Sequence, residues 1–126
     1  MLDLKEEIRD GFLVTVERKK LWNVQLDLLM ELLRVCNKHN IKVFAVCGTL
    51  LGAIRHNGFI PWDDDMDVGL LREDYNKLLK VGKNEFKEPY FLQTALNEDY
   101  YFSHVARLRN SNTTGIVKSD IKLKCN

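Results

Sequence analysis

Four aspartates fall within five consecutive positions of this chain, and core-type residues follow them at once. The four are Asp63, Asp64, Asp65 and Asp67. In an extended chain side chains alternate between faces, so Asp65 and Asp67 share one side while Met66 and Val68 point to the other. The segment is therefore expected to turn its apolar side to a core and its acidic side to a surface or cleft. So dense an anionic cluster is hard to stabilise without a cation.

The spacing of Asp65 and Asp67 suits a metal site. Their Cα atoms lie roughly 6.5 to 7 Å apart in a strand, so the carboxylates can converge on one cation or a pair. Magnesium is expected because it prefers oxygen ligands and substrate phosphates. Asp63 and Asp64 are interpreted as turn residues beside the site, although Asp63 reaches the cation if the backbone stays extended. A solvated acidic loop remains the alternative, whereas a calcium loop is set aside because Val68 stands where its pattern requires glycine.

A strand, a tight turn and a short helix are predicted directly upstream, over residues 41–47, Gly48-Thr49 and residues 50–56. A glycine at a strand exit lets the backbone approach a ligand, and the N–H groups of a helix start attract phosphate. The Gly48-Thr49 turn is therefore predicted to bind a phosphate beside the metal site. Arg55, at the end of the short helix, either clamps a phosphate or complements the helix dipole, and the structural role is favoured for His56.

The remaining pattern predicts interleaved helices and strands. Helices are expected near residues 21–39 and 73–86, and strands at 66–71, 90–96 and 102–109, followed by a turn at 113–115 and strand character near 116, 117 and 121. This order indicates an α/β (α+β) fold with a mixed sheet flanked by helices. At 126 residues the chain is expected to form a single domain, or a large part of one.

Composition excludes several classes of function. A net charge of +1 gives no electrostatic reason to bind nucleic acid, and the basic triplet at residues 18–20 is interpreted as a solvated face near a helix start. No apolar stretch reaches the roughly 18 residues that span a bilayer, and the acidic N-terminus is unlike a signal peptide. The three cysteines are irregularly spaced and indicate neither a disulfide framework nor a zinc site. A cytoplasmic protein with reduced thiols is expected.

The stretch from Gly48 to Leu70, GTLLGAIRHNGFIPWDDDMDVGL, resembles the LicD family of phosphocholine transferases, relatives of the fukutin proteins in the nucleotidyltransferase superfamily. The likeness extends to residues 7–14, 21–39 and 108–114. It implies a nucleotidyltransferase-like fold and a metal-dependent transfer of a phospho-alcohol. Phosphocholine from CDP-choline is the typical donor group, and the acceptor is a hydroxyl of a cell-surface glycan such as lipopolysaccharide or teichoic acid, reached at the inner membrane face.

Carried over residue by residue, the resemblance implies that Gly48 and Thr49 form the phosphate-binding turn and that Asp65 and Asp67 are the metal-binding, catalytic carboxylates. The family's third acidic residue lies in a stretch like Phe-Ile-Asp-Ile-Phe, which does not occur before Asn126. The chain is therefore expected to resemble an N-terminal portion that catalyses poorly alone. Two alternatives stay open: a metal-dependent glycosyltransferase that uses Asp-x-Asp, and a noncatalytic nucleotide- or metal-binding module.

Overall fold

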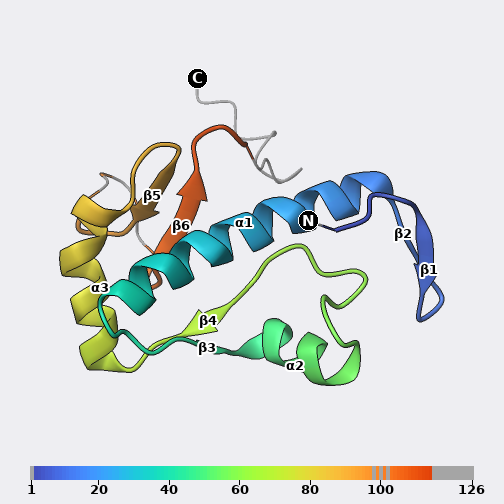
Figure 1. The fold of residues 1–126 in the computed structure, drawn as a ribbon, viewed down its shortest axis with the longest axis horizontal. Coiled ribbons are helices and arrows are strands. Elements are labelled where there is room, and N and C mark those ends of the chain that lie inside the picture. Colours follow the sequence, from blue (N-terminus) through green and yellow to red (C-terminus); the bar gives the residue numbers. More distant parts are fainter. Residues whose placement is uncertain (1, 98, 100, 102, 115–126) are drawn as a thin grey trace.

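The long helix α1 (Val16–Lys38) runs along the length of the molecule, and the other elements are distributed around it (Figure 1). The computed structural model describes residues 2–97, 99, 101 and 103–114. Thr15 caps α1, because its hydroxyl accepts a hydrogen bond from the backbone N–H of Arg18 at 3.2 Å. The helix starts five residues before the predicted position 21, since the apolar stripe that guided the prediction marks only its buried face.

A β-hairpin precedes α1 and was not predicted. Strands β1 (Glu7–Arg9) and β2 (Phe12–Val14) pair antiparallel. The two linking residues, Asp10 and Gly11, have φ of 51° and 75°, and a two-residue turn with both φ positive matches the twist of a hairpin. Strands of three residues are too short to show alternation, so the Asp-Gly pair is the only signal that could have revealed them.

An ion pair between Glu7 and Lys19 fastens the hairpin to α1, and a second pair joins Glu7 to Arg9 within β1. Glu7 contacts Lys19 at 3.2 Å and Arg9 at 2.6 Å, and the Lys19 and Arg9 side chains lower the pKa of the Glu7 carboxyl. Lys19 is only 6% exposed. The prediction of a solvated basic face at residues 18–20 is therefore wrong for Lys19, because its ammonium group has a carboxylate partner that the sequence alone did not place.

The central segment consists of β3 (Phe44–Ala45), α2 (Cys47–Arg55) and β4 (Val68–Gly69). The strands pair antiparallel, with Phe44 opposite Gly69. Both are shorter than the predicted strands at 41–47 and 66–71. Helix α2 begins three residues earlier than predicted, so Gly48 and Thr49 lie in its first turn and do not form a separate tight turn.

Helix α3 (Arg72–Glu85), β5 (Tyr90–Gln93) and β6 (Arg107–Asn110) complete the described fold. The bounds of α3 agree with the prediction within one residue. Strand β5 ends before the predicted residue 96 because Asn97 closes a turn, accepting a hydrogen bond from the Thr94 backbone N–H at 2.8 Å. Strand β6 covers only the end of the predicted 102–109. Strand character at 116, 117 and 121 falls outside the described residues, as does Gly115 of the predicted turn.

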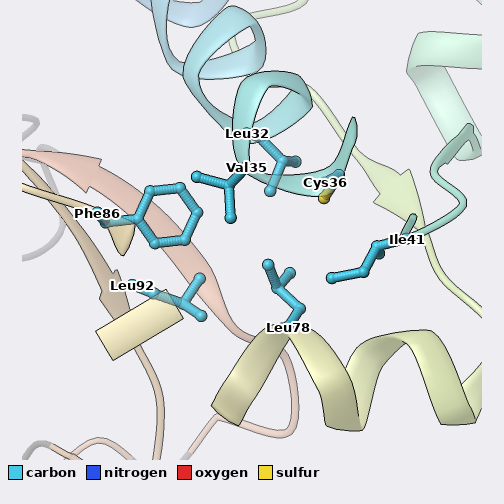
Figure 2. Packing of buried hydrophobic residues seen from close by; sticks show 7 residues of the cluster. All are labelled: Leu32, Val35, Cys36, Ile41, Leu78, Phe86 and Leu92. Atoms are coloured by element: carbon cyan, nitrogen blue, oxygen red, sulfur yellow. The ribbon is translucent and has the colours of Figure 1, made fainter. Parts of the chain in front are cut away.

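The main core lies where the C-terminal half of α1 meets α3 and the β5–β6 pair (Figure 2). Its buried residues are Leu32, Val35, Cys36, Ile41, Leu78, Phe86 and Leu92. Burial, with the nearby Asp74 carboxylate, raises the pKa of the Cys36 thiol to about 11. Cys36 is thus a small buried hydrophobe, whereas Cys47, for which the sequence suggested the same role, is exposed.

The α/β (α+β) class is confirmed, but the strands are not joined in one mixed sheet. In the described part of the chain they form three separate antiparallel pairs, β1–β2, β3–β4 and β5–β6. Neither α1 nor any other described helix is both long and apolar enough to cross a membrane.

Candidate functional site

The acidic segment, residues 63–67, lies against α1 (Figure 1). Side chains of α1 hold the segment through hydrogen bonds to its backbone. The backbone carbonyl of Asp63 accepts two hydrogen bonds, each of 3.0 Å, from Arg18 Nη1 and Trp22 Nε1. Gln25 Nε2 donates to the carbonyl of Asp64 at 3.4 Å. Because these donors bind carbonyl oxygens, they leave the carboxylates beside them to other ligands, although Asp63 Oδ1 accepts a hydrogen bond from the backbone N–H of Asp64 at 3.1 Å.

Trp22 gives this anchor its rigidity. It is 1% exposed, and its ring stacks on Phe59 with centroids 4.8 Å apart and planes 3° from parallel. A buried indole must place its N–H on an acceptor, and here that acceptor is the acidic segment. Arg18, Trp22 and Gln25 were missed from the sequence, although their i, i+4, i+7 spacing puts them on one helix face.

Three of the aspartates gather their carboxylates. Oxygen atoms of Asp63, Asp64 and Asp65 all lie within 4.8 Å of one another. Burial raises the pKa of the Asp65 carboxyl, and the negative charges of Asp67, Asp63 and Asp64 raise it further. No basic side chain among the described residues forms an ion pair with the four carboxylates. The cluster therefore has the charge and the oxygen donors of a site for a hard cation.

The grouping differs from the one that alternation predicts. Asp65 was expected to pair with Asp67, but the gathered group joins Asp65 to Asp63 and Asp64. Strand β4 starts only at Val68, so the rule that alternate residues share a face does not apply to the preceding aspartates. Asp67 still acts on Asp65 through its charge.

Helix α2 meets the acidic segment at its first turn. The Thr49 hydroxyl accepts a hydrogen bond from the backbone N–H of Asp67 at 2.8 Å. A Cβ added to Gly48 would lie 2.6 Å from Asp63 Oδ2, so only a glycine leaves that carboxylate its position. The N–H groups of a first helical turn have no partner within the helix. Gly48 and Thr49 thus lie beside the carboxylate cluster, as the phosphate-anchor prediction required.

A cavity of about 150 Å³ adjoins this junction. Its walls are mostly apolar, with two carboxylates among them, and consist of Leu26, Gly48, Thr49, Ala53, Gly58, Phe59, Ile60, Asp63, Asp65 and Met66. Gly52 permits the loop after α2 to close over the helix, because an added Cβ would lie 2.5 Å from the carbonyl oxygen of Gly58.

Arg55 is exposed in the last turn of α2. Its Nε donates to Nε2 of His56 at 2.9 Å, and Nδ1 of His56 is 2.5 Å from Asp10 Oδ2. Trp62 contacts the edge of the His56 ring, with centroids 5.6 Å apart, and that of Phe12 at 6.0 Å. Asp10 was not singled out in the sequence, because its partner is 46 residues away.

A family model described as the nucleotidyltransferase domain of LicD, FKTN and FKRP matches residues 40–122. The chain belongs to the LicD family. The matched region contains the acidic segment and all of α2, whereas the hairpin and α1 precede it.

Three curated relatives each match part of this LicD-family chain. A lipopolysaccharide cholinephosphotransferase named LicD, from Haemophilus influenzae, is 43% identical over 72 residues, which are 57% of this chain and 27% of that protein. Uncharacterized proteins of Rickettsia prowazekii and Rickettsia typhi are each 49% identical, over 54 and 47 residues. These cover 43% and 37% of this chain and 20% and 15% of those proteins. The chain thus spans about a quarter or less of their length, and no solved structure matches it.

Proposed function

We propose that this chain carries the metal- and donor-binding part of an enzyme that transfers a phospho-alcohol, foremost phosphocholine, from a CDP-linked donor to a hydroxyl of a cell-surface glycan. The donor is CDP-choline or a related CDP-alcohol, and the reaction takes place at the cytoplasmic face of the membrane. Family membership and the cholinephosphotransferase activity named for the Haemophilus relative support the reaction class. The observation that carries the proposal is the contact between the unpaired carboxylate cluster and the first turn of α2.

The residues of the cluster fit magnesium. Carboxylate oxygens are its preferred protein ligands, and within the described part of the chain no ion pair neutralises the carboxylates that face Asp65. Asp65 and Asp67 remain the principal candidates for metal binding and catalysis, and the structure adds Asp63 and Asp64 to the group. When bound, a divalent cation neutralises charge on the donor phosphates and polarises them.

The protein's own groups would bind and orient the donor. The N–H groups of Gly48 and Thr49, in the first turn of α2, have no partner within the helix and would bind a donor phosphate beside the cluster. Arg55 offers a guanidinium at the opposite end of α2. Arg18, Trp22 and Gln25 hold the acidic main chain still, so its carboxylates keep their arrangement while a phosphate approaches.

Isothermal titration tests the proposal. The chain is titrated with CDP-choline, CDP-glycerol and CDP-ribitol, with and without magnesium, and CMP release is followed in parallel. Wild type is compared with Asp65→Asn and Asp67→Asn, and Asp99→Asn serves as an exposed carboxylate outside the cluster. We expect magnesium-dependent binding of a CDP-alcohol that both cluster variants lose and the control keeps.

The outcomes separate the alternatives. Donor binding that needs no magnesium and survives both substitutions would remove the carboxylates from the site. Preference for a UDP-sugar over every CDP-alcohol would indicate the glycosyltransferase. Binding in the full-length protein without CMP release in the presence of acceptor would indicate a noncatalytic module.

A further inference from the structure

His56 is held at both ring nitrogens. Its side chain is only 5% exposed, although it follows directly on the last turn of α2. Nε2 lies 2.9 Å from Arg55 Nε, and Nδ1 lies 2.5 Å from Asp10 Oδ2. A single ring therefore connects the turn of the N-terminal hairpin to an arginine on the helix that begins at the acidic cluster.

The partners of the ring define its tautomer. A guanidinium N–H can only donate, so Nε2 is the acceptor and carries no proton. The proton is then on Nδ1, which donates to the Asp10 carboxylate.

Arg55 is left with its two terminal nitrogens available. Within the described part of the chain, only its Nε is engaged in a hydrogen bond. A guanidinium fixed through Nε presents its terminal N–H groups as a preset fork, the geometry that binds a phosphate bidentately. Fixing the group beforehand reduces the conformational entropy lost when an anion binds.

The same ring also contacts the acidic segment. The His56 and Trp62 rings meet edge to face, at an interplanar angle of 83°, and Trp62 directly precedes Asp63. Phe12, from the hairpin, contacts Trp62 as well. The hairpin, the end of α2 and the start of the acidic segment therefore converge on His56 and Trp62.

We propose that Asp10 and His56 are positioning residues that orient the Arg55 guanidinium toward a phosphate of the anionic donor. The inference rests on the proposed function, and it adds a donor-orienting role for the N-terminal hairpin, which lies outside the residues that the family model matches. Arg55 contacts the phosphate, His56 fixes Arg55, and Asp10 fixes the tautomer of His56.

We call the series Asp10, His56 and Arg55 the relay. Two probes test it: CDP-choline with magnesium, and inorganic pyrophosphate with magnesium. The variants are Arg55→Ala, His56→Leu, Asp10→Ala and His56→Gln. The glutamine is the rescue variant, because its amide oxygen can accept from Arg55 Nε in place of Nε2. Mn²⁺ affinity, read by electron paramagnetic resonance, and thermal unfolding are measured on every variant.

We expect Arg55→Ala to weaken both probes by about tenfold or more, as loss of a charge-assisted contact does. His56→Leu should lose as much probe affinity as Arg55→Ala, and Asp10→Ala should lose less. His56→Gln should recover most of the affinity that His56→Leu loses. Adding His56→Leu to Arg55→Ala should cause no further loss, since one contact is removed twice. Mn²⁺ affinity should stay at the wild-type value throughout.

Other results overturn the relay. Unchanged probe affinity in Arg55→Ala would do so, as would failure of His56→Gln to bind better than His56→Leu. An equal fall in Mn²⁺ affinity and probe affinity in His56→Leu would show a purely structural role. Wild type that binds Mn²⁺ but neither probe removes the relay and leaves the metal site standing, whereas wild type that binds no Mn²⁺ refutes the proposed function and the relay with it.

Discussion

The Thr49 hydroxyl accepts the hydrogen bond that the backbone N–H of Asp67 donates, at 2.8 Å. The backbone carbonyl of the same residue, Asp67, accepts a hydrogen bond from the N–H of Val46 at 3.3 Å. Both backbone polar groups of Asp67 are therefore bonded to the start of α2, at its N-cap and in its first turn. This arrangement keeps the first turn of that helix and the acidic segment in a fixed relationship, which a site shared by a cation and a phosphate requires.

Replacing Thr49 with valine should loosen this relationship. Thr49→Val removes the acceptor at nearly constant size, so we expect a loss of about 0.5 to 1.5 kcal/mol in the free energy of unfolding and weaker Mn²⁺ binding. Thr49→Ser keeps the oxygen and should stay near wild type on both measures. Chemical denaturation and metal titration measure the two effects. Equal behaviour of the serine and valine variants would show that the hydroxyl contributes nothing.

The Asp65 charge should destabilise the metal-free protein. Its pKa is raised in the fold by burial and by the neighbouring carboxylates, so the folded state binds protons more readily than the unfolded state. Stability from this group is then lost as pH rises through the folded pKa. Asp65→Asn should therefore raise the thermal midpoint at neutral pH when metal is absent.

With magnesium, wild type should instead become more stable than Asp65→Asn. A ligand at about 100 times its dissociation constant stabilises the folded state by about 2.7 kcal/mol, and the asparagine variant should gain much less. Thermal unfolding with EDTA and with magnesium gives both comparisons, and Asp99→Asn should change neither. A variant less stable than wild type in EDTA would mean that Asp65 makes a favourable contact within the fold.

The sequence predicted helices and strands where the burial of one face produces a regular spacing of apolar residues. Helix α1 was predicted from its apolar stripe, which faces the core, and the end of α3 was predicted from Pro89, which limits a helix. The hairpin was missed because three-residue strands show no period. Alternation paired Asp65 with Asp67 and gave Asp63 only a conditional place, whereas the chain is not yet a strand at these residues.

The candidate site was proposed from residue types, whereas the contacts that hold it in place required the fold. Gly48, Thr49 and the aspartates were identified from motif chemistry. The contacts of Trp22 with Asp63 and of Asp10 with His56 join residues 41 and 46 positions apart. Such pairings depend on how the elements pack, and a local pattern carries no trace of them.

The structure keeps Gly48 in the candidate site but gives a different reason why a glycine is needed there. The sequence suggested that a side chain there would crowd a phosphate, whereas the fold shows that it would first meet Asp63 Oδ2. Gly48→Ala should therefore retain the fold and displace the Asp63 carboxylate. We expect Mn²⁺ affinity to fall about 10- to 100-fold, the usual effect of misorienting a metal ligand.

Two variants control the Gly48 experiment. Gly82→Ala also adds a methyl group to a helical glycine, but its neighbours are Leu92 and Phe86 in the core, so it should alter stability and leave metal affinity unchanged. Adding Asp63→Asn to Gly48→Ala should cost little beyond the worse single variant. Wild-type Mn²⁺ affinity in Gly48→Ala would show that Asp63 is not a ligand.

The far end of α3 offers a test of the fold that is independent of the site. The Lys38 ammonium and the His39 ring, which bond to Glu85 at 2.8 and 2.9 Å, lower the pKa of the Glu85 carboxyl from 4.5 to about 2. A carboxyl whose pKa is depressed in the fold stabilises the protein above its unfolded pKa, and this contribution is lost as pH falls through its folded pKa. Glu85→Gln should thus be less stable than wild type at neutral pH. The difference should persist down to about pH 4.5 and disappear by about pH 2, as followed by urea unfolding across that range.

Glu88→Gln is the control, because Glu88 is an exposed residue on the loop after α3. It should show a much smaller difference. A Glu85→Gln deficit that stays constant from neutral pH to about pH 2 would mean that the side chain packs favourably without its charge mattering.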